Sequence, residues 1–186
     1  HHGLFWTPPT SYSGALYEKL KLAMDHNLAV YSSHLPLDAH PEIGNNRLLA
    51  DALNLPILEW FLFHEGTPIA AIAKAPAHRN VLRQSLLDRF GPHLTAIEFG
   101  SETPQRIAIL SGSGRSALAE LHSHQTDTLI TGELRQEHFN YAQENRLNLY
   151  VCGHYATETF GVKALSEEVS AHFGIPACFL ETGCPL

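Results

Sequence analysis

Histidines and carboxylates in a few short segments are the residues of this sequence best suited to bind a metal ion. His154 and Glu158 stand four residues apart in the segment GHYATE at residues 153–158, and this spacing places both side chains on one face of a helix. An imidazole and a carboxylate held together form a bidentate arm for a divalent ion, and the second carboxylate oxygen can reach a neighbouring ion. A hydrogen-bonded surface pair is the alternative interpretation.

A further carboxylate, Asp38, lies in the segment HLPLDAHP at residues 34–41. This segment follows an apolar run at residues 28–31 that predicts a short buried strand, and α/β sheets expose functional residues beyond the carboxyl ends of their strands. Asp38 is therefore a candidate ligand, with His34 and His40 as residues that support or replace it. The alternative is that Asp38 only organises the turn with its side-chain oxygen.

Two adjacent histidines, His1 and His2, begin the chain. Adjacent residues of an extended segment point to opposite sides, so the two imidazoles suit two ions better than one. Dinuclear sites hold two ions about 3.5 to 4 Å apart, and a carboxylate can bridge them. The alternative is that the pair is a remnant of a purification tag.

A glycine-rich segment offers a different chemistry. Residues 112–117 (GSGRSA) formally match the dinucleotide fingerprint, and Glu133 follows about 20 residues later, where a ribose-binding acid would stand. The position of this segment in the second half of the chain counts against that interpretation. A milder hypothesis is a phosphate site made by backbone N–H groups at the start of a helix. Those groups belong to Ser111, Gly112, Ser113 and Gly114. A tight turn that needs glycine only for its dihedral angles is the alternative.

Alternating helical and strand-like runs predict an α/β fold. Helical spacing occurs at residues 13–26, 45–53, 78–90, 116–124, 133–145 and 157–173. Short strand-like runs occur at residues 28–31, 57–63, 69–73, 94–99, 106–110, 127–130, 147–151 and 177–180. This alternation favours βαβ crossovers and a parallel or mixed sheet covered by helices. The turn at residues 65–68 is the best candidate for a domain boundary.

Composition excludes several classes of function. The net charge of -7 and the absence of a Lys/Arg cluster argue against a nucleic-acid-binding surface. No segment is apolar enough to cross a bilayer, and the 3 cysteines form no CxxC pair, which argues against a disulfide scaffold and favours a reducing compartment. We therefore expect a soluble, cytoplasmic protein. GxSxG, P-loop, HExxH and EF-hand patterns do not occur, which removes the commonest serine hydrolase, NTPase, zincin and calcium-sensor interpretations.

Taken together, the segments at residues 1–6 (HHGLFW), 34–46 (HLPLDAHPEIGNN), 131–133 (TGE) and 153–158 (GHYATE) resemble one known family. It is the NGG-interacting-factor-three-like dinuclear-metal family, whose members are often labelled GTP cyclohydrolase I type 2 homologues. The resemblance runs in order over essentially the whole chain and argues against a tag origin for the leading histidines. It implies that two metal ions are bound, with Glu158 as the bridge. The implied ligands are His1, His2, Asp38, His154 and Glu158. A family variant has histidine at the position of Tyr155, to which we assign no ligand role.

The expected organisation is two intertwined α/β lobes with mixed sheets covered by helices. Residues 1–66 and 153–186 would form the metal-binding lobe, and residues 67–152 the second lobe. Members of the family usually carry a further strand and helix before the leading histidines, so we expect the N-terminal part of the first lobe to be missing. The resemblance also implies a ring-shaped homo-oligomer, commonly a hexamer, with metal sites facing its interior.

Two functions remain open at this point. The first is a metal-dependent hydrolase acting on a nucleotide, with His34 or Glu133 as a proton carrier. By resemblance its nominal reaction is the hydrolytic ring opening of GTP with loss of formate. The second is a metal carrier, or a regulatory metal-binding protein, that uses the same ligands without turnover. Mixed imidazole and carboxylate ligands suit zinc, iron, manganese or nickel.

Overall fold

The computed structural model describes residues 1–5 and 11–184. Trp6, the last residue of the first motif segment, lies outside the described residues. The chain divides into two compact units, His1–His34 and Leu35–Leu186. We call them the N-terminal unit and the sheet unit and describe each by itself.

The described residues of the N-terminal unit form one helix, α1 (Gly14–Asp25), and none of the residues of that helix is buried. The predicted strand at residues 28–31 is wrong. Those residues form no strand, and Leu28, Val30 and Tyr31 are 59%, 57% and 81% exposed. The physical reason is that an apolar run becomes a strand only beside a pairing partner, and no described residue of this unit lies in a strand.

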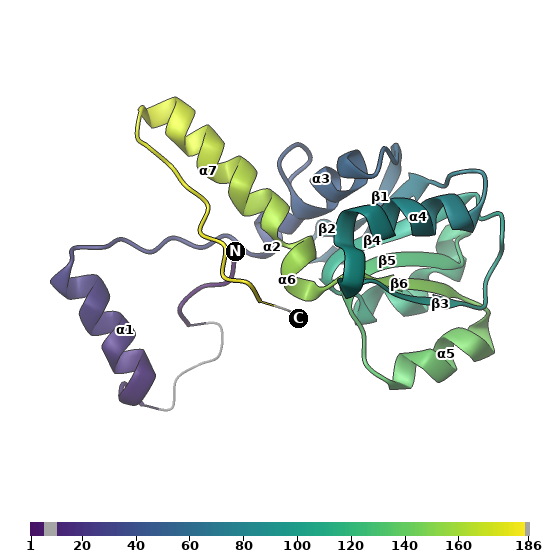
Figure 1. The fold of residues 1–186 in the computed structure, drawn as a ribbon, viewed down its shortest axis with the longest axis horizontal. Helices are drawn as coiled ribbons and strands as arrows, with labels where there is room; N and C mark the ends of the chain where they lie inside the picture. Colours follow the sequence, from purple (N-terminus) through teal and green to yellow (C-terminus); the bar gives the residue numbers. More distant parts are fainter. Residues whose placement is uncertain (6–10, 185–186) are drawn as a thin grey trace. The chain divides into compact units, whose positions relative to one another are not determined.

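The sheet unit is built on one six-stranded sheet with the order β1-β2-β4-β5-β6-β3 (Figure 1). Its strands are β1 (Ile57–His64), β2 (Thr67–Lys74), β3 (Thr95–Glu98), β4 (Arg106–Ser113), β5 (Thr128–Glu133) and β6 (Asn148–Val151). Strands β4, β5 and β6 run parallel, whereas the other neighbouring strands pair antiparallel. The predicted α/β class with a mixed sheet covered by helices is confirmed.

A tight hairpin joins the first two strands. Glu65 and Gly66 both have positive φ values, 48° and 82°, as a two-residue turn of type I′ requires. His64 pairs with Thr67 across this turn. The sheet is therefore continuous across the predicted boundary at residues 65–68, and the predicted division into lobes stays a prediction.

Alternating side chains of the sheet feed two hydrophobic cores. On β4, Ile107 and Ile109 point into one core, and Ala108 and Leu110 point into the other, as the period of two in a strand requires. Helices α3 (Asn45–Ala52) and α4 (Arg79–Phe90) cover the first face. Helix α5 (Glu137–Asn145) covers the opposite face (Figure 1). The 3-10 helix η2 (Arg115–Glu120) packs into the same core as α5.

The structure also describes a long helix, α7 (Thr159–Phe173), and two single-turn helices, α2 (Leu35–Asp38) and α6 (His154–Thr157). Two further 3-10 helices are η1 (Gly91–His93) and η3 (His122–His124). The predicted helix at residues 116–124 is thus two 3-10 helices, and the helix predicted at residues 157–173 is interrupted at Glu158.

The predicted last strand at residues 177–180 is also wrong. Gly174 ends α7 with a φ of 67°, and residues 175–184 have no regular structure. Leu180 is 77% exposed. As at residues 28–31, an apolar run without a neighbouring strand does not become part of a sheet.

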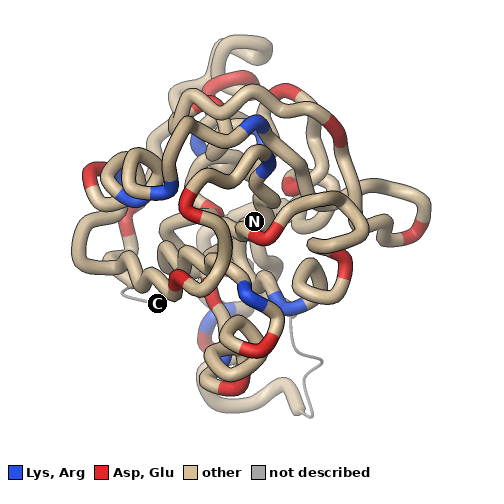
Figure 2. The backbone as a smooth tube through the Cα atoms, turned by 90° about the vertical axis from the view of Figure 1, so that its right-hand side faces the viewer, with Lys and Arg blue, Asp and Glu red and all other residues tan. Residues whose placement is uncertain are grey.

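The distribution of charged residues and the apolar character of the helices bear on possible binding partners. Figure 2 shows Asp and Glu distributed widely along the described backbone, with Lys and Arg interspersed among them. The absence of nucleic-acid binding stays a prediction that fits this distribution. Within the part of the chain that the structure describes, no helix is long and apolar enough to span a membrane. The cytoplasmic location stays a prediction.

Candidate metal centre

The carboxyl ends of three parallel strands bring the main candidate residues of the sheet unit together. Strand β4 ends at Ser113, and β5 ends at Glu133. Beyond the end of β6, Cys152 N–H donates to the Thr131 carbonyl (2.8 Å) and Gly153 N–H to the Gly132 carbonyl (2.9 Å). These two bonds continue the pairing of β5 with the chain that follows β6. They place Glu133 beside His154, the first residue of α6, at the edge of the sheet where α/β proteins carry their functional residues.

His154 lies between two carboxylates. Its Nδ1 is 3.2 Å from Oε2 of Glu133, and its Nε2 is 3.1 Å from Oε2 of Glu158. The two acids differ in exposure, since the Glu133 side chain is 54% exposed and the Glu158 side chain only 10%. The hydrogen bond to Glu158 is the largest cause that raises the pKa of His154 to about 9, with a smaller contribution from Glu133 and partial opposition from burial.

Two glycines make room for this pair. Gly112 has a φ of +62°, and a Cβ there would overlap Oε1 of Glu158 and lie 3.1 Å from Nε2 of His154. A Cβ on Gly132 would lie 2.8 Å from Cα of His154. Side chains at these positions would occupy the space that His154 and Glu158 now fill, so the site depends on glycine for both conformation and volume.

Asp38 is buried and held by polar side chains. Its Oδ1 accepts hydrogen bonds from Nδ2 of Asn45 (2.8 Å) and from the hydroxyl of Ser111 (3.3 Å). Asn46 donates to the Asp38 carbonyl (3.2 Å) and accepts from the Ser111 N–H (2.7 Å). Asp38 is 5% exposed, and both asparagines are fully buried. These bonds fix the orientation of the carboxylate without a metal.

The same network ties α7 to the site. Asn45 Oδ1 accepts from the Gly161 N–H (2.7 Å), and Thr157 Oγ1 accepts from the Gly112 N–H (3.0 Å). The sequence predicts Asn45 or Asn46 as the N-cap of α3, which is wrong, because Gly44 is the N-cap and both asparagines lie inside the helix. Their role in this network was missed. The available signal was the asparagine pair itself, which stands in the segment at residues 34–46 that carries the family resemblance.

The predicted phosphate-binding segment donates most of its N–H groups within the protein. The N–H of Ser111 bonds to Asn46, that of Gly112 to Thr157, and that of Gly114 to the Glu133 carbonyl (3.2 Å). These bonds count against an anion at this turn, because an anion site needs unsatisfied N–H groups. Phosphate binding by residues 111–114 stays a prediction.

Three imidazoles gather in the N-terminal unit. The ring centroids of His1 and His2 are 5.0 Å apart, and those of His34 are 4.6 Å from His1 and 4.8 Å from His2. The expectation that His1 and His2 point to opposite sides does not hold, because residues 1–3 form no strand. His34 therefore joins the candidate ligands beside His1 and His2, whereas the sequence predicts it as a partner or substitute of Asp38 or as a proton carrier.

His40 has a different role from these three. Its Nδ1 accepts the N–H groups of Glu42 and Ile43, each at 3.2 Å. The imidazole thereby closes the turn that leads into α3, and we assign it no ligand role.

The chemistry of these donors fits divalent metal ions. One nitrogen from each of His1, His2 and His34 lies within 4.8 Å of the others. Ligand atoms that bind one ion at about 2.0–2.2 Å stand roughly 3–4 Å apart. A small movement of the three histidine side chains would therefore allow them to share an ion. In the sheet unit, Nε2 of His154 and Oε2 of Glu158 are already at such a separation.

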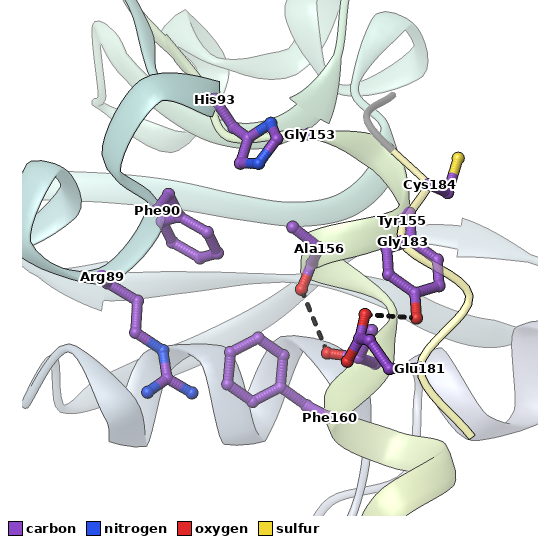
Figure 3. Close-up of a pocket in the computed structure, with 11 residues that line it drawn as sticks. Arg89, Phe90, His93, Gly153, Tyr155, Ala156, Phe160, Glu181, Gly183 and Cys184 are labelled. Carbon is purple, nitrogen blue, oxygen red and sulfur yellow. Dashed lines mark hydrogen bonds between the residues drawn. The ribbon is translucent and has the colours of Figure 1, made fainter. Parts of the chain in front are cut away.

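A cavity of about 340 Å³ lies beside α6 (Figure 3). Tyr155 donates to Glu181 (2.7 Å) at its edge, and the guanidinium of Arg89 lies 5.1 Å from the ring centroid of Phe160. The cavity is lined by Arg89, Phe90, His93, Gly153, Tyr155, Ala156, Thr159, Phe160, Glu181, Gly183 and Cys184. None of the five predicted metal ligands lines it, so the candidate centre is a different site.

Comparison with known proteins decides the family. The sequence model described as Duf34/NIF3 (NGG1p interacting factor 3) matches residues 1–184. The chain belongs to the Duf34/NIF3 family. The resemblance found in the sequence motifs is thereby confirmed.

Relatives of this Duf34/NIF3 chain share most of its length. A protein of Deinococcus radiodurans named "GTP cyclohydrolase 1 type 2 homolog" is 40% identical, over 97% of this chain and 69% of that protein. One of Pyrococcus horikoshii with the same name is 37% identical, over 97% of this chain and 73% of that protein.

Solved structures agree with the fold. The structure described as protein ybgI, of unknown function, has a TM-score of 0.90 and 30% identity, over 100% of this chain and 75% of that chain. The protein TTHA1606 from Thermus thermophilus has a TM-score of 0.85 and 33% identity, over 100% of this chain and 74% of that chain.

Proposed function

We propose that this Duf34/NIF3 chain is a dinuclear metal-dependent hydrolase that acts on a nucleotide. The proposed ligands are His1, His2, His34, Asp38, His154 and Glu158. The observation that supports the proposal most is the pairing of His154 Nε2 with the nearly buried Glu158 carboxylate, 3.1 Å apart at the carboxyl ends of parallel strands. Zinc, iron, manganese and nickel all suit this donor set.

The candidate ligands of the sheet unit each have a role in this proposal. Bound ions would lower the pKa of a water molecule and polarise the scissile group. Glu158 offers one oxygen on each side, with Oε2 toward His154 and Oε1 toward Gly112, which suits a bridging carboxylate. Asn45 and Ser111 hold Asp38 in one orientation. The carboxylate would therefore lose little conformational freedom when a metal ion binds.

The substrate class rests on the names of the relatives. Two relatives at 40% and 37% identity carry the name GTP cyclohydrolase 1 type 2 homolog. The proposed reaction is therefore the hydrolytic opening of the purine ring of GTP with release of formate.

Formate release from GTP by metal-loaded protein tests the hydrolase. Protein purified without a nickel column would first be analysed for metal, and two equivalents per chain are expected. Formate should then form with GTP and should fall to background in Glu158→Ala. Glu137→Ala, on an acid that is 62% exposed on α5, is the matched control and should keep wild-type turnover. Two equivalents of metal without turnover on nucleotides would overturn the hydrolase and support a carrier. A lack of metal uptake would overturn both.

The oligomeric state belongs to the same proposal. We propose a homohexamer, for which light scattering coupled to size exclusion should give six times the chain mass of 20.6 kDa. A mass equal to one chain would overturn it.

A further inference from the structure

Glu133 is the residue of the candidate centre whose role the proposed function leaves open. From the sequence it was a candidate proton carrier. Its position suggests another task, because its carboxylate is 3.2 Å from Nδ1 of His154 and not from the nitrogen that faces Glu158. The two nitrogens of one imidazole are thus engaged by two different carboxylates.

We propose that Glu133 is a positioning residue that acts through His154. Its carboxylate accepts the Nδ1–H of His154 and so orients the ring with Nε2 toward Glu158, where a bound metal ion would replace the Nε2 proton. This inference rests on the proposed metal centre and deepens it. Metal-binding histidines commonly donate their other ring N–H to a carboxylate, which fixes the tautomer and the ring orientation.

The backbone fixes both partners. The Gly153 N–H donates to the Gly132 carbonyl (2.9 Å), so the residues before His154 and before Glu133 are directly bonded. On its other side, the Glu133 carbonyl accepts the N–H of Gly114 (3.2 Å). Main-chain bonds between adjacent strand ends therefore fix the two backbone positions from which the Glu133 and His154 side chains reach each other.

Exposure separates the two acids that contact His154. Glu158 is nearly buried, and its Oε2 faces Nε2 of His154, the nitrogen proposed to bind the metal. The Glu133 side chain is 54% exposed, so its removal leaves no buried charge without a partner. Substitutions at Glu133 should therefore leave the fold intact and change only what His154 does.

Metal affinity, measured by competition with a chromophoric chelator for zinc, tests the inference. Glu133→Ala should weaken zinc binding about 10- to 100-fold. Glu133→Gln should retain most of the affinity, because the amide oxygen still accepts the Nδ1–H. Glu137→Ala is the matched control, since Glu137 is exposed and also lies near a histidine, 4.0 Å from His138 Nε2. It should bind zinc as the wild type does.

A spectrum gives the second readout. In zinc-loaded protein labelled with ¹⁵N in histidine, His154 should carry its proton on Nδ1 and its metal on Nε2. Glu133→Ala should show loss of that single tautomer, while thermal unfolding of the metal-free variant matches the wild type. A His154 ring bound to metal through Nδ1 would overturn the inference.

The outcomes also separate this inference from the proposed function. If the wild type takes up no metal, the proposed centre fails. If the wild type binds zinc and Glu133→Ala binds it within twofold of the wild type, only the positioning role fails. Equal losses of turnover in Glu133→Ala and Glu133→Gln with unchanged zinc affinity would assign Glu133 as a proton carrier instead.

Discussion

The two units contribute candidate ligands from very different surroundings. In the sheet unit, Asp38 is buried and held by two fully buried asparagines, and Glu158 is nearly buried beside a glycine. In the N-terminal unit, three histidines gather in a segment whose one helix buries none of its residues. The packing of the sheet unit therefore holds its three candidate ligands in place, whereas the N-terminal unit offers its three histidines little packing of its own.

The largest expected effect is on the stability of the sheet unit. Asn46→Ala removes a fully buried amide that bonds to the carbonyls of Asp38 and Ile69 and to the N–H of Ser111. Leaving these groups unpaired should lower the free energy of unfolding by about 3 kcal/mol. Urea denaturation of the metal-free protein measures it. Asn140→Ala, at an exposed position of α5, should change stability by less than about 0.5 kcal/mol. Equal stability changes in Asn46→Ala and Asn140→Ala would show that the asparagine network does not organise the ligands of the sheet unit.

A pair of glycine substitutions sharpens the comparison inside the sheet unit. Gly112 and Gly66 both have positive φ, but a Cβ on Gly112 overlaps Glu158, whereas one on Gly66 has nothing within 4 Å. Gly66→Ala should cost about 1 kcal/mol for the backbone conformation alone. Gly112→Ala should cost about 1 kcal/mol more, since Glu158 must move, and should also weaken metal binding. Thermal and urea unfolding measure the difference, and equal costs would show that Glu158 yields without strain.

His34→Ala tests the candidate ligands of the N-terminal unit. Metal affinity should fall about 10-fold or more, because one imidazole ligand is lost. The stability of the metal-free protein should change by less than about 0.5 kcal/mol, since the imidazole is not part of a packed core. Isothermal titration with zinc and urea denaturation give the two values. If the metal-free His34→Ala protein lost as much stability as Asn46→Ala, the two units would not differ in how packing holds their candidate ligands.

The smallest expected effect is that of metal removal on Cys152. This residue is fully buried, and burial raises the pKa of its thiol to about 12, so it should resist alkylation. Cys178 and Cys184 are exposed and should react. Mass spectrometry after brief treatment with iodoacetamide should give two labels per chain with or without a chelator. A third label that appears only after chelation would mean that the sheet unit needs metal to stay packed.

Local sequence patterns predicted much of the fold and part of the site. The alternation of helices and strands gave the α/β class, and the spacing of His154 and Glu158 gave a pair that does lie in contact. The apolar runs at residues 28–31 and 177–180 misled, because an apolar run predicts burial without naming the strand that must pair with it. The helix break at Glu158 was equally hidden, since its neighbours have helical spacing on both sides.

The roles of single polar residues were harder to predict because they depend on distant partners. Asn46 meets Ser111, 65 positions away, and Asn45 meets Gly161, 116 positions away. No local pattern contains such a separation. Likewise, the sequence could not group His34 with His1 and His2, because the intervening 31 residues must fold back to bring the three rings together. Ligand identity, metal content and oligomeric state all stay predictions.

The amide of Asn45 sets a limit for redesign of the centre. Its nitrogen serves Asp38 and its oxygen serves the first turn of α7, so neither aspartate nor leucine can replace it, because aspartate cannot donate and leucine can neither donate nor accept. An engineer who wishes to shift Asp38 toward a larger cation must therefore shift the start of that helix by the same amount. Tuning of ion preference at this position is coupled to the architecture of the fold.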